Sequence, residues 1–164
     1  FRSGTVLLNL KKGTLSKEMG GDISIGFSSI FWNTAWTKGQ APHTLGILCN
    51  PDHPALDEFP TEYHSNYQWW DAMNHSEAIN LTSFPTDLKP IVRVIDDWFT
   101  NRPIALIIEG KVGKGKILIS GIDLTTDLEK RPEAQQLLFS LKKYMVGEKF
   151  NPKVELKAEQ IKKL

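Results

Sequence analysis

The chain has 164 residues, which corresponds to a single domain by the usual size of domains. Twenty lysine and arginine residues balance nineteen aspartate and glutamate residues, 40% of the chain is apolar and 24% is charged. These values are typical of a globular protein with a buried core, and they exclude a disordered, collagen-like or strongly basic nucleic-acid-binding chain.

Charge is distributed unevenly along the chain. Residues 1–50 carry a net charge of +3, residues 51–100 of −7 and residues 101–164 of +5. Because an acidic middle repels phosphate, no nucleic-acid partner is expected. The clearest apolar run, residues 104–108, is much shorter than the roughly 20 residues that span a bilayer, so no membrane partner is expected either.

Cys49 is the single cysteine of the chain, so the sequence allows no intramolecular disulfide and no multi-cysteine metal site. The chain begins at Phe1, without an initiator methionine or the hydrophobic region of a signal peptide. The apolar run at residues 5–10 already predicts a buried strand, so we expect the chain to be cut from a longer polypeptide.

Further short apolar runs predict the next strands. The run at residues 44–49 is followed by a proline and is typical of a strand buried on both faces. Residues 52–56 predict a short helical turn, which Pro60 must end. Residues 78–81 and 91–95 predict two more strands.

The clearest local signal is a pair of apolar runs, residues 104–108 and 116–120, that flank Gly113-Lys114-Gly115 and predict a β-hairpin. The same stretch matches the first part of the phosphate-binding loop pattern, but Ile117 stands where that loop has a magnesium-binding hydroxyl. A β-branched strand also follows where the loop needs a helix. We therefore interpret it as a hairpin turn and expect no nucleotide.

A helix is predicted from Pro132 to residue 146, because apolar residues recur at one-face spacing and Gly147 follows as a stop. Residues 1–150 are expected to form one α/β domain, and the lysine-rich residues 151–164 a tail with a short helix. Buried strands, one clear helix and one hairpin predict a layered αβα fold with a mostly parallel sheet and an antiparallel hairpin.

Several residues are of the types that catalyse reactions, but their spacing in the sequence matches no known catalytic arrangement. Cys49 at a strand end, with His75 and Glu77 downstream, could provide a thiol nucleophile, a base and an orienting carboxylate. No glycine-flanked elbow follows the cysteine, so a buried, inert thiol is the better interpretation. The histidines lack metal-ligand spacing, and adjacent acids such as Asp96 and Asp97 are typical of a solvated face. The sequence assigns no catalytic residue, metal ligand or cofactor.

Aromatic and amide side chains are concentrated in the middle of the chain. Rings that stack and amides that hydrogen-bond suit a sugar surface, but the same rings fill cores and domain interfaces, which is the commoner use. The candidates for a carbohydrate or interface role are Trp32, Trp36, Glu62, His64, Asn66, Gln68, Trp69, Trp70, Trp98 and Arg102. If residues 62–69 are extended, alternation places Glu62, His64, Asn66 and Gln68 on one side and Tyr63, Tyr67 and Trp69 on the other.

A set of spaced motifs covers most of residues 4–152. They are Phe31-Trp32-Asn33-Thr34-Ala35-Trp36, Pro42-His43-Thr44-Leu45-Gly46-Ile47-Leu48, His53-Pro54-Ala55-Leu56, Phe59-Pro60-Thr61-Glu62-Tyr63-His64-Ser65-Asn66, Gln68-Trp69-Trp70, Asp96-Asp97-Trp98, Asn101-Arg102, the hairpin, and Arg131-Pro132 with the helix after it. Together they resemble the C-terminal region of glycoside hydrolase family 2 enzymes from gut Bacteroides-type bacteria.

The resemblance implies a fold and a setting. Family 2 enzymes are β-galactosidases, β-mannosidases, β-glucuronidases and relatives, with both catalytic glutamates in a (β/α)₈ barrel, and no motif of that barrel occurs in this chain. The matching region is a flavodoxin-like or glutamine-amidotransferase-like domain without the amidotransferase triad. It implies a non-catalytic accessory domain, in the periplasm or outside the cell, whose partner is the catalytic domain of the same polypeptide. The alternative is a carbohydrate-binding module that holds an oligosaccharide with its tryptophan and tyrosine cluster.

Overall fold

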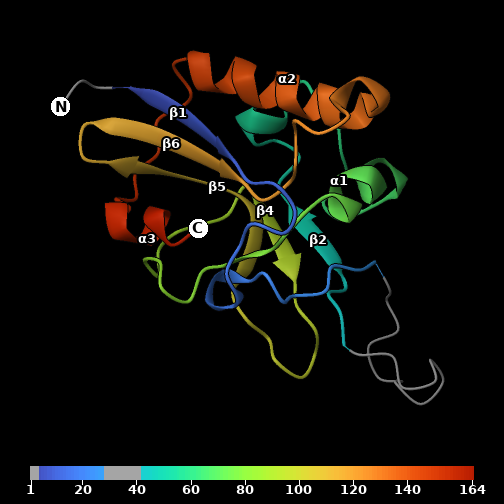
Figure 1. Ribbon diagram of the computed structural model, residues 1–164. Helices are drawn as coiled ribbons and strands as arrows, with labels where there is room; N and C mark the ends of the chain where they lie inside the picture. The colour runs from blue at the N-terminus through green and yellow to red at the C-terminus, as the bar shows by residue number, and fades with distance from the viewer. Residues whose placement is uncertain (1–3, 28–41) are drawn as a thin grey trace.

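A mixed β-sheet organises the computed structural model, which describes residues 4–27 and 42–164 (Figure 1). Within these residues the sheet has six strands in the order β1-β6-β5-β4-β2, with β3 paired to β5. The strands are β1 (Thr5–Asn9), β2 (Gly46–Cys49), β3 (Ile79–Asn80), β4 (Val92–Ile95), β5 (Ile104–Val112) and β6 (Gly115–Ser120).

The directions of the strands correct the predicted fold class. Among the described strands, β1 and β6 run parallel, and every other pairing is antiparallel. The sheet is therefore mostly antiparallel, and the layered, mostly parallel αβα prediction is wrong. Short connections enforce this result for β4–β5 and β5–β6, because paired strands joined by a tight turn or a brief loop run in opposite directions. Continuous apolar runs such as Ile104–Ile108 report burial on both faces, which an antiparallel strand at the centre of a sheet shares with a parallel one.

Each face of the sheet carries its own core. On one face, α2 (Pro132–Val146) buries Ala134, Leu137, Leu141 and Tyr144 against the strands, beside the 3-10 helix η2 (Pro54–Leu56) and α1 (Trp70–Asn74). On the other face lie η1 (Lys17–Met19), the loop after β3 and α3 (Ala158–Lys162). The remaining 3-10 helices are η3 (Tyr67–Trp69) and η4 (Leu128–Lys130). Since α2 is the one long helix of the described residues, only one face has a full helical layer.

Several local predictions are confirmed. The β5–β6 hairpin turns at Gly113 and Lys114, where Val112 pairs with Gly115 and Gly113 takes a φ of +58°, a left-handed conformation that suits glycine. α2 begins at Pro132 and ends before Gly147, as the spacing predicts. Apart from these predictions, no helix of the described residues is long and apolar enough to cross a membrane.

Two strands lie at the edges of the sheet and are less buried than predicted. Val6 of β1 is 53% exposed on a strand that pairs with β6 alone, and Leu48 of β2 is 44% exposed on a strand that pairs with β4 and is bridged to His64 on its other side. The C-terminal segment is tied into the fold, since Lys111 donates to the carbonyl of Val154 at 2.8 Å and accepts from the amide of Leu156 at 2.7 Å.

Candidate functional site

The loop between β4 and β5, residues 96–102, is held by a buried carboxylate. Asp96 is 7% exposed, and it forms a two-pronged ion pair with Arg102, at 2.8 Å from Nε to Oδ2 and 3.0 Å from Nη2 to Oδ1. The backbone amides of Arg102 and Asp97 also donate to this carboxylate, at 2.6 and 2.8 Å. The two ends of the loop are thereby clamped together.

The neighbouring carboxylate organises the tip of the loop. Asp97 Oδ1 accepts from the backbone amides of Phe99 and Thr100, both at 2.9 Å, and from the Thr100 hydroxyl at 3.0 Å, while Arg102 Nη2 donates to Oδ2 at 3.2 Å. Asn101 closes the loop in a left-handed conformation with a φ of 51°. The sequence-based expectation that these acids lie on a solvated face is wrong, because both are buried as loop-stabilising hydrogen-bond acceptors.

The electrostatics of the clamp agree with its geometry. Burial alone would raise the pKa of Asp96, but hydrogen bonds from the side chain and amide of Arg102 and from the Asp97 amide outweigh it, so the pKa lies below its ordinary value. The hydrogen bonds with Asp96 raise the pKa of Arg102 despite partial burial, and the charges of Asp97 and Asp22 act in the same direction. The pair is therefore ionised at neutral pH.

Two aromatic side chains project from this clamped loop. Trp98 is 62% exposed and Phe99 is 65% exposed, with ring centroids 6.5 Å apart in an edge-to-face arrangement. All four carboxylate oxygens of Asp96 and Asp97 accept hydrogen bonds from the loop itself. The loop therefore exposes two aromatic rings, while its carboxylate oxygens already accept hydrogen bonds within the loop.

The segment at residues 62–70 lies beside the β2 edge of the sheet for its first half. His64 forms an antiparallel bridge with Leu48, and the carbonyl of Tyr63 accepts from the amide of Cys49 at 2.9 Å. Glu62, Tyr63 and His64 are exposed.

The second half of this segment is helical, so the predicted alternation is wrong from residue 67 onward. Asn66 caps η3 by accepting from the amide of Gln68 at 3.1 Å. Trp69 is fully buried, edge-on to Phe59 at 5.0 Å, and its Nε1 donates to the Thr61 hydroxyl at 2.6 Å. Trp69 therefore belongs to the core, whereas Tyr67 is 88% exposed and Trp70 is 56% exposed.

The pairing of the strands brings the two segments to one end of the sheet. The Ser65 hydroxyl accepts from the amide of Ile47 at 3.4 Å, and Gly46 pairs with Ile95, the residue before Asp96.

Trp32 and Trp36 lie outside the described residues. The described residues on either side of them meet at this end of the sheet, where the amide of Gly26 donates to the Thr44 hydroxyl at 2.9 Å.

The other chemical candidates occupy structural positions. Cys49 is buried, as predicted, its Sγ donates to the carbonyl of Glu62 at 3.3 Å, and burial raises the pKa of the thiol. His75 instead contacts Asp71, at 3.2 Å from Nδ1 to Oδ1. Across residues 4–27 and 42–164, no group of three histidine, cysteine or acidic side chains is arranged to hold a metal ion.

Phe99 was missed by the sequence analysis, although it follows Trp98 directly in a short connection between two predicted strands. Its position in a short loop could have predicted that Phe99 is exposed, because the tip of such a loop lies at the surface whatever its composition.

The described residues form a mixed, mostly antiparallel sheet with one long helix, and the 96–102 loop exposes two aromatic rings. Residues 2–164 match the family described as a domain of unknown function, DUF8487, and the chain belongs to this family. No curated protein matches the chain.

Proposed function

We propose that this chain is a non-catalytic accessory domain of a glycoside hydrolase of family 2, and that it packs against the catalytic domain of the same polypeptide through the 96–102 loop. The observation that carries this proposal is the exposure of Phe99 and Trp98 on a loop that Asp96 and Arg102 hold in one conformation. Two adjacent exposed rings are costly to leave in water, and a pre-ordered loop loses little entropy when a protein surface covers it. The choice of a family 2 catalytic domain as the partner rests on the motifs that resemble the C-terminal region of those enzymes.

The hydrogen bonds of the loop favour a protein contact over a sugar contact. A sugar site combines a ring that stacks on the apolar face of the sugar with polar groups that bind its hydroxyls. In the 96–102 loop the carboxylates of Asp96 and Asp97 and the Arg102 guanidinium bind one another. A protein surface needs only the apolar area of the rings.

The carbohydrate-binding alternative is favoured by a different part of the molecule. Tyr67 and Trp70 are both exposed around η3, and the exposed side chains of Glu62 and His64 belong to the same segment. Sugar binding there would place rings next to groups able to hydrogen-bond hydroxyls.

The test compares this chain with the complete polypeptide encoded by its gene. We expect the complete polypeptide to hydrolyse a chromogenic β-glycoside, and the amides of residues 97–100 to exchange hydrogen more slowly in it than in the isolated chain. Phe99→Ala should remove that extra protection, and Phe139→Ala should not, because Phe139 is a 53% exposed phenylalanine on α2. A complete polypeptide without glycosidase activity, or equal exchange in both proteins, refutes the proposal.

The same samples decide between the two functions. In the isolated chain, oligosaccharides released from plant polysaccharide should leave the tryptophan fluorescence unchanged. A saturable fluorescence change that Trp70→Ala abolishes without unfolding the chain would support the carbohydrate-binding module instead.

A further inference from the structure

The β1 edge of the sheet is open. In the parallel pairing with β6, the carbonyl of Gly4 accepts from Lys116 and the amide of Leu10 donates to Ser120, both at 2.9 Å. Since alternate residues of a strand turn their backbone groups to opposite sides, Thr5, Leu7 and Asn9 direct theirs away from β6. Among the residues that the structure describes, no strand pairs with that outer side.

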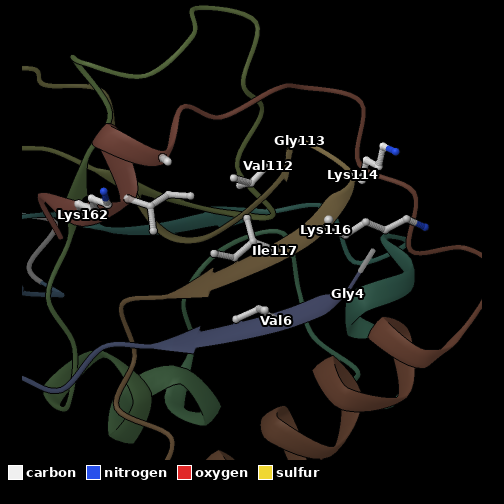
Figure 2. A pocket seen from close by; sticks show the side chains of 11 residues that line it. Gly4, Val6, Val112, Gly113, Lys114, Lys116, Ile117 and Lys162 are labelled. Carbon is white, nitrogen blue, oxygen red and sulfur yellow. The ribbon is translucent and has the colours of Figure 1, made fainter. Parts of the chain in front are cut away.

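An apolar groove adjoins this edge, on the face of the sheet that carries α3. Its volume is about 600 Å³, and Val6, Val112, Ile117 and Ile161 are among the side chains that line it. Figure 2 shows Val6, Ile117 and Val112 directed into the groove, with Lys162 at one end and Lys114 at the other. A strand added beside β1 would lie along the open side of this groove, with alternate side chains on the same face of the sheet as Val6.

The sequence of β1 contains none of the usual protections of an edge strand. Natural edge strands are blunted by charged residues, proline or bulges, whereas Thr5–Asn9 has neither a charged residue nor a proline and is paired with β6 without a register shift. An exposed apolar edge of this kind is a template for strand addition.

The lysines beside the groove favour an added strand with acidic residues. Lys114 and Lys162 are exposed, and neither takes part in an ion pair of the described residues. Glu155, from the C-terminal segment, accepts from the amide of Gly113 at 2.7 Å, and among the described residues it forms no ion pair with Lys114. A second copy of the chain is disfavoured, because a second β1 strand, Thr5–Asn9, contains no acidic residue that could meet these lysines.

We propose that β1 and its groove bind an extended peptide segment of a partner, which adds to the sheet as a strand, with apolar side chains on the groove and acidic residues at its ends. The backbone of Thr5, Leu7 and Asn9 provides the hydrogen bonds, Val6 and Ile117 the apolar contact, and Lys114 and Lys162 the preference for acidic ends. This site is independent of the proposed contact at the 96–102 loop.

The test uses a short capped peptide in which valine and threonine alternate between terminal aspartates, and a counterpart with terminal lysines. We expect the acidic peptide to slow hydrogen exchange at the amides of Thr5, Leu7 and Asn9, and to bind roughly tenfold more tightly than the lysine peptide, as two exposed ion pairs allow. The double variant Lys114→Glu with Lys162→Glu should reverse this preference.

Val6→Glu should abolish binding of the acidic peptide, and Val146→Glu is its matched control, since Val146 is an 87% exposed valine on α2. Binding without protection of the three β1 amides overturns the proposal, as does equal affinity for the two peptides. Self-association that protects β1 in the absence of peptide would assign the edge to a second copy. Binding of decanoate at Val6 and Ile117, with no binding of peptide, would assign the groove to a small amphiphile.

Discussion

Replacing Arg102 by leucine tests the clamp on which the proposed function depends. The substitution removes the two side-chain hydrogen bonds to Asp96 and the one to Asp97, and it leaves a carboxylate whose side chain is 1% exposed without its counter-ion. Removing one partner of a fully buried pair costs about 3–5 kcal/mol. Because the Arg102 side chain is 28% exposed and two backbone amides still bind Asp96, we expect about 2 kcal/mol.

The pH dependence identifies the cause of this loss. In the native chain the pKa of Asp96 is lowered, so its contribution to stability is present at neutral pH and is lost as the pH falls below about 4. Without the Arg102 side chain, only two backbone amides favour the ionised form of Asp96, and burial opposes it, so the stabilisation at neutral pH is lost. The difference in unfolding free energy between the two proteins should therefore be largest near pH 7 and should shrink as the pH falls.

Urea unfolding followed by circular dichroism at several pH values measures this difference. Arg93→Leu is the matched control, because Arg93 is an exposed arginine on β4 and its removal should change stability by less than about 0.5 kcal/mol. The reasoning is refuted if the two variants lose equal stability, or if the loss in the Arg102 variant does not depend on pH.

Three further predictions concern the core, the thiol and the hairpin. Trp69→Ala should lower the unfolding free energy measured in urea by about 3–5 kcal/mol, because the Trp69 ring is buried. Trp70→Ala should lower it by less than about 1 kcal/mol, because the Trp70 ring is exposed. Equal losses would contradict the assignment of Trp69 to the core. The Cys49 thiol should react with a disulfide reagent much more slowly in the native chain than in denaturant at the same pH, since burial raises its pKa; equal rates would restore it as a candidate nucleophile. Gly113→Ala should lower the unfolding free energy by about 1 kcal/mol, because alanine is strained at a φ of +58°. The added carbon meets no atom within 4 Å, so no clash increases this cost. Lys114→Ala should be close to neutral.

Local features of the chain were predictable because a few neighbouring residues determine them. The glycine turn at Gly113 and the helix start at Pro132 follow from backbone preferences that act within one or two turns. The direction of the strands was not predictable in the same way, since burial on both faces gives the same apolar run in parallel and antiparallel sheets. The short connection at residues 96–103 was the better guide, because it is too brief for a parallel crossover.

The candidate site was only partly predictable for a related reason. Arg102 was among the candidates, but its partner Asp96 looked like a solvated acid because adjacent carboxylates usually are. The burial of Asp96 depends on Arg102, six residues away, and on the loop conformation that joins them. Trp69 and Trp70 are neighbours of one residue type, and only tertiary packing against Phe59 separates the core ring from the exposed one.

The two proposed contacts lie at opposite corners of one sheet. The 96–102 loop follows β4, near the β2 edge, whereas the groove lies at β1, three strands from β4. The directions of the strands also place the β5–β6 hairpin, with Lys114, at the end of the sheet opposite to the 96–102 loop. A sheet is stiff along its hydrogen-bonded direction, so a protein held at both corners has its orientation fixed by two separate contacts. Under the two proposals, a partner bound at both corners would be held in one orientation, because a single contact leaves rotation about it free and a second contact on the same sheet restricts that rotation.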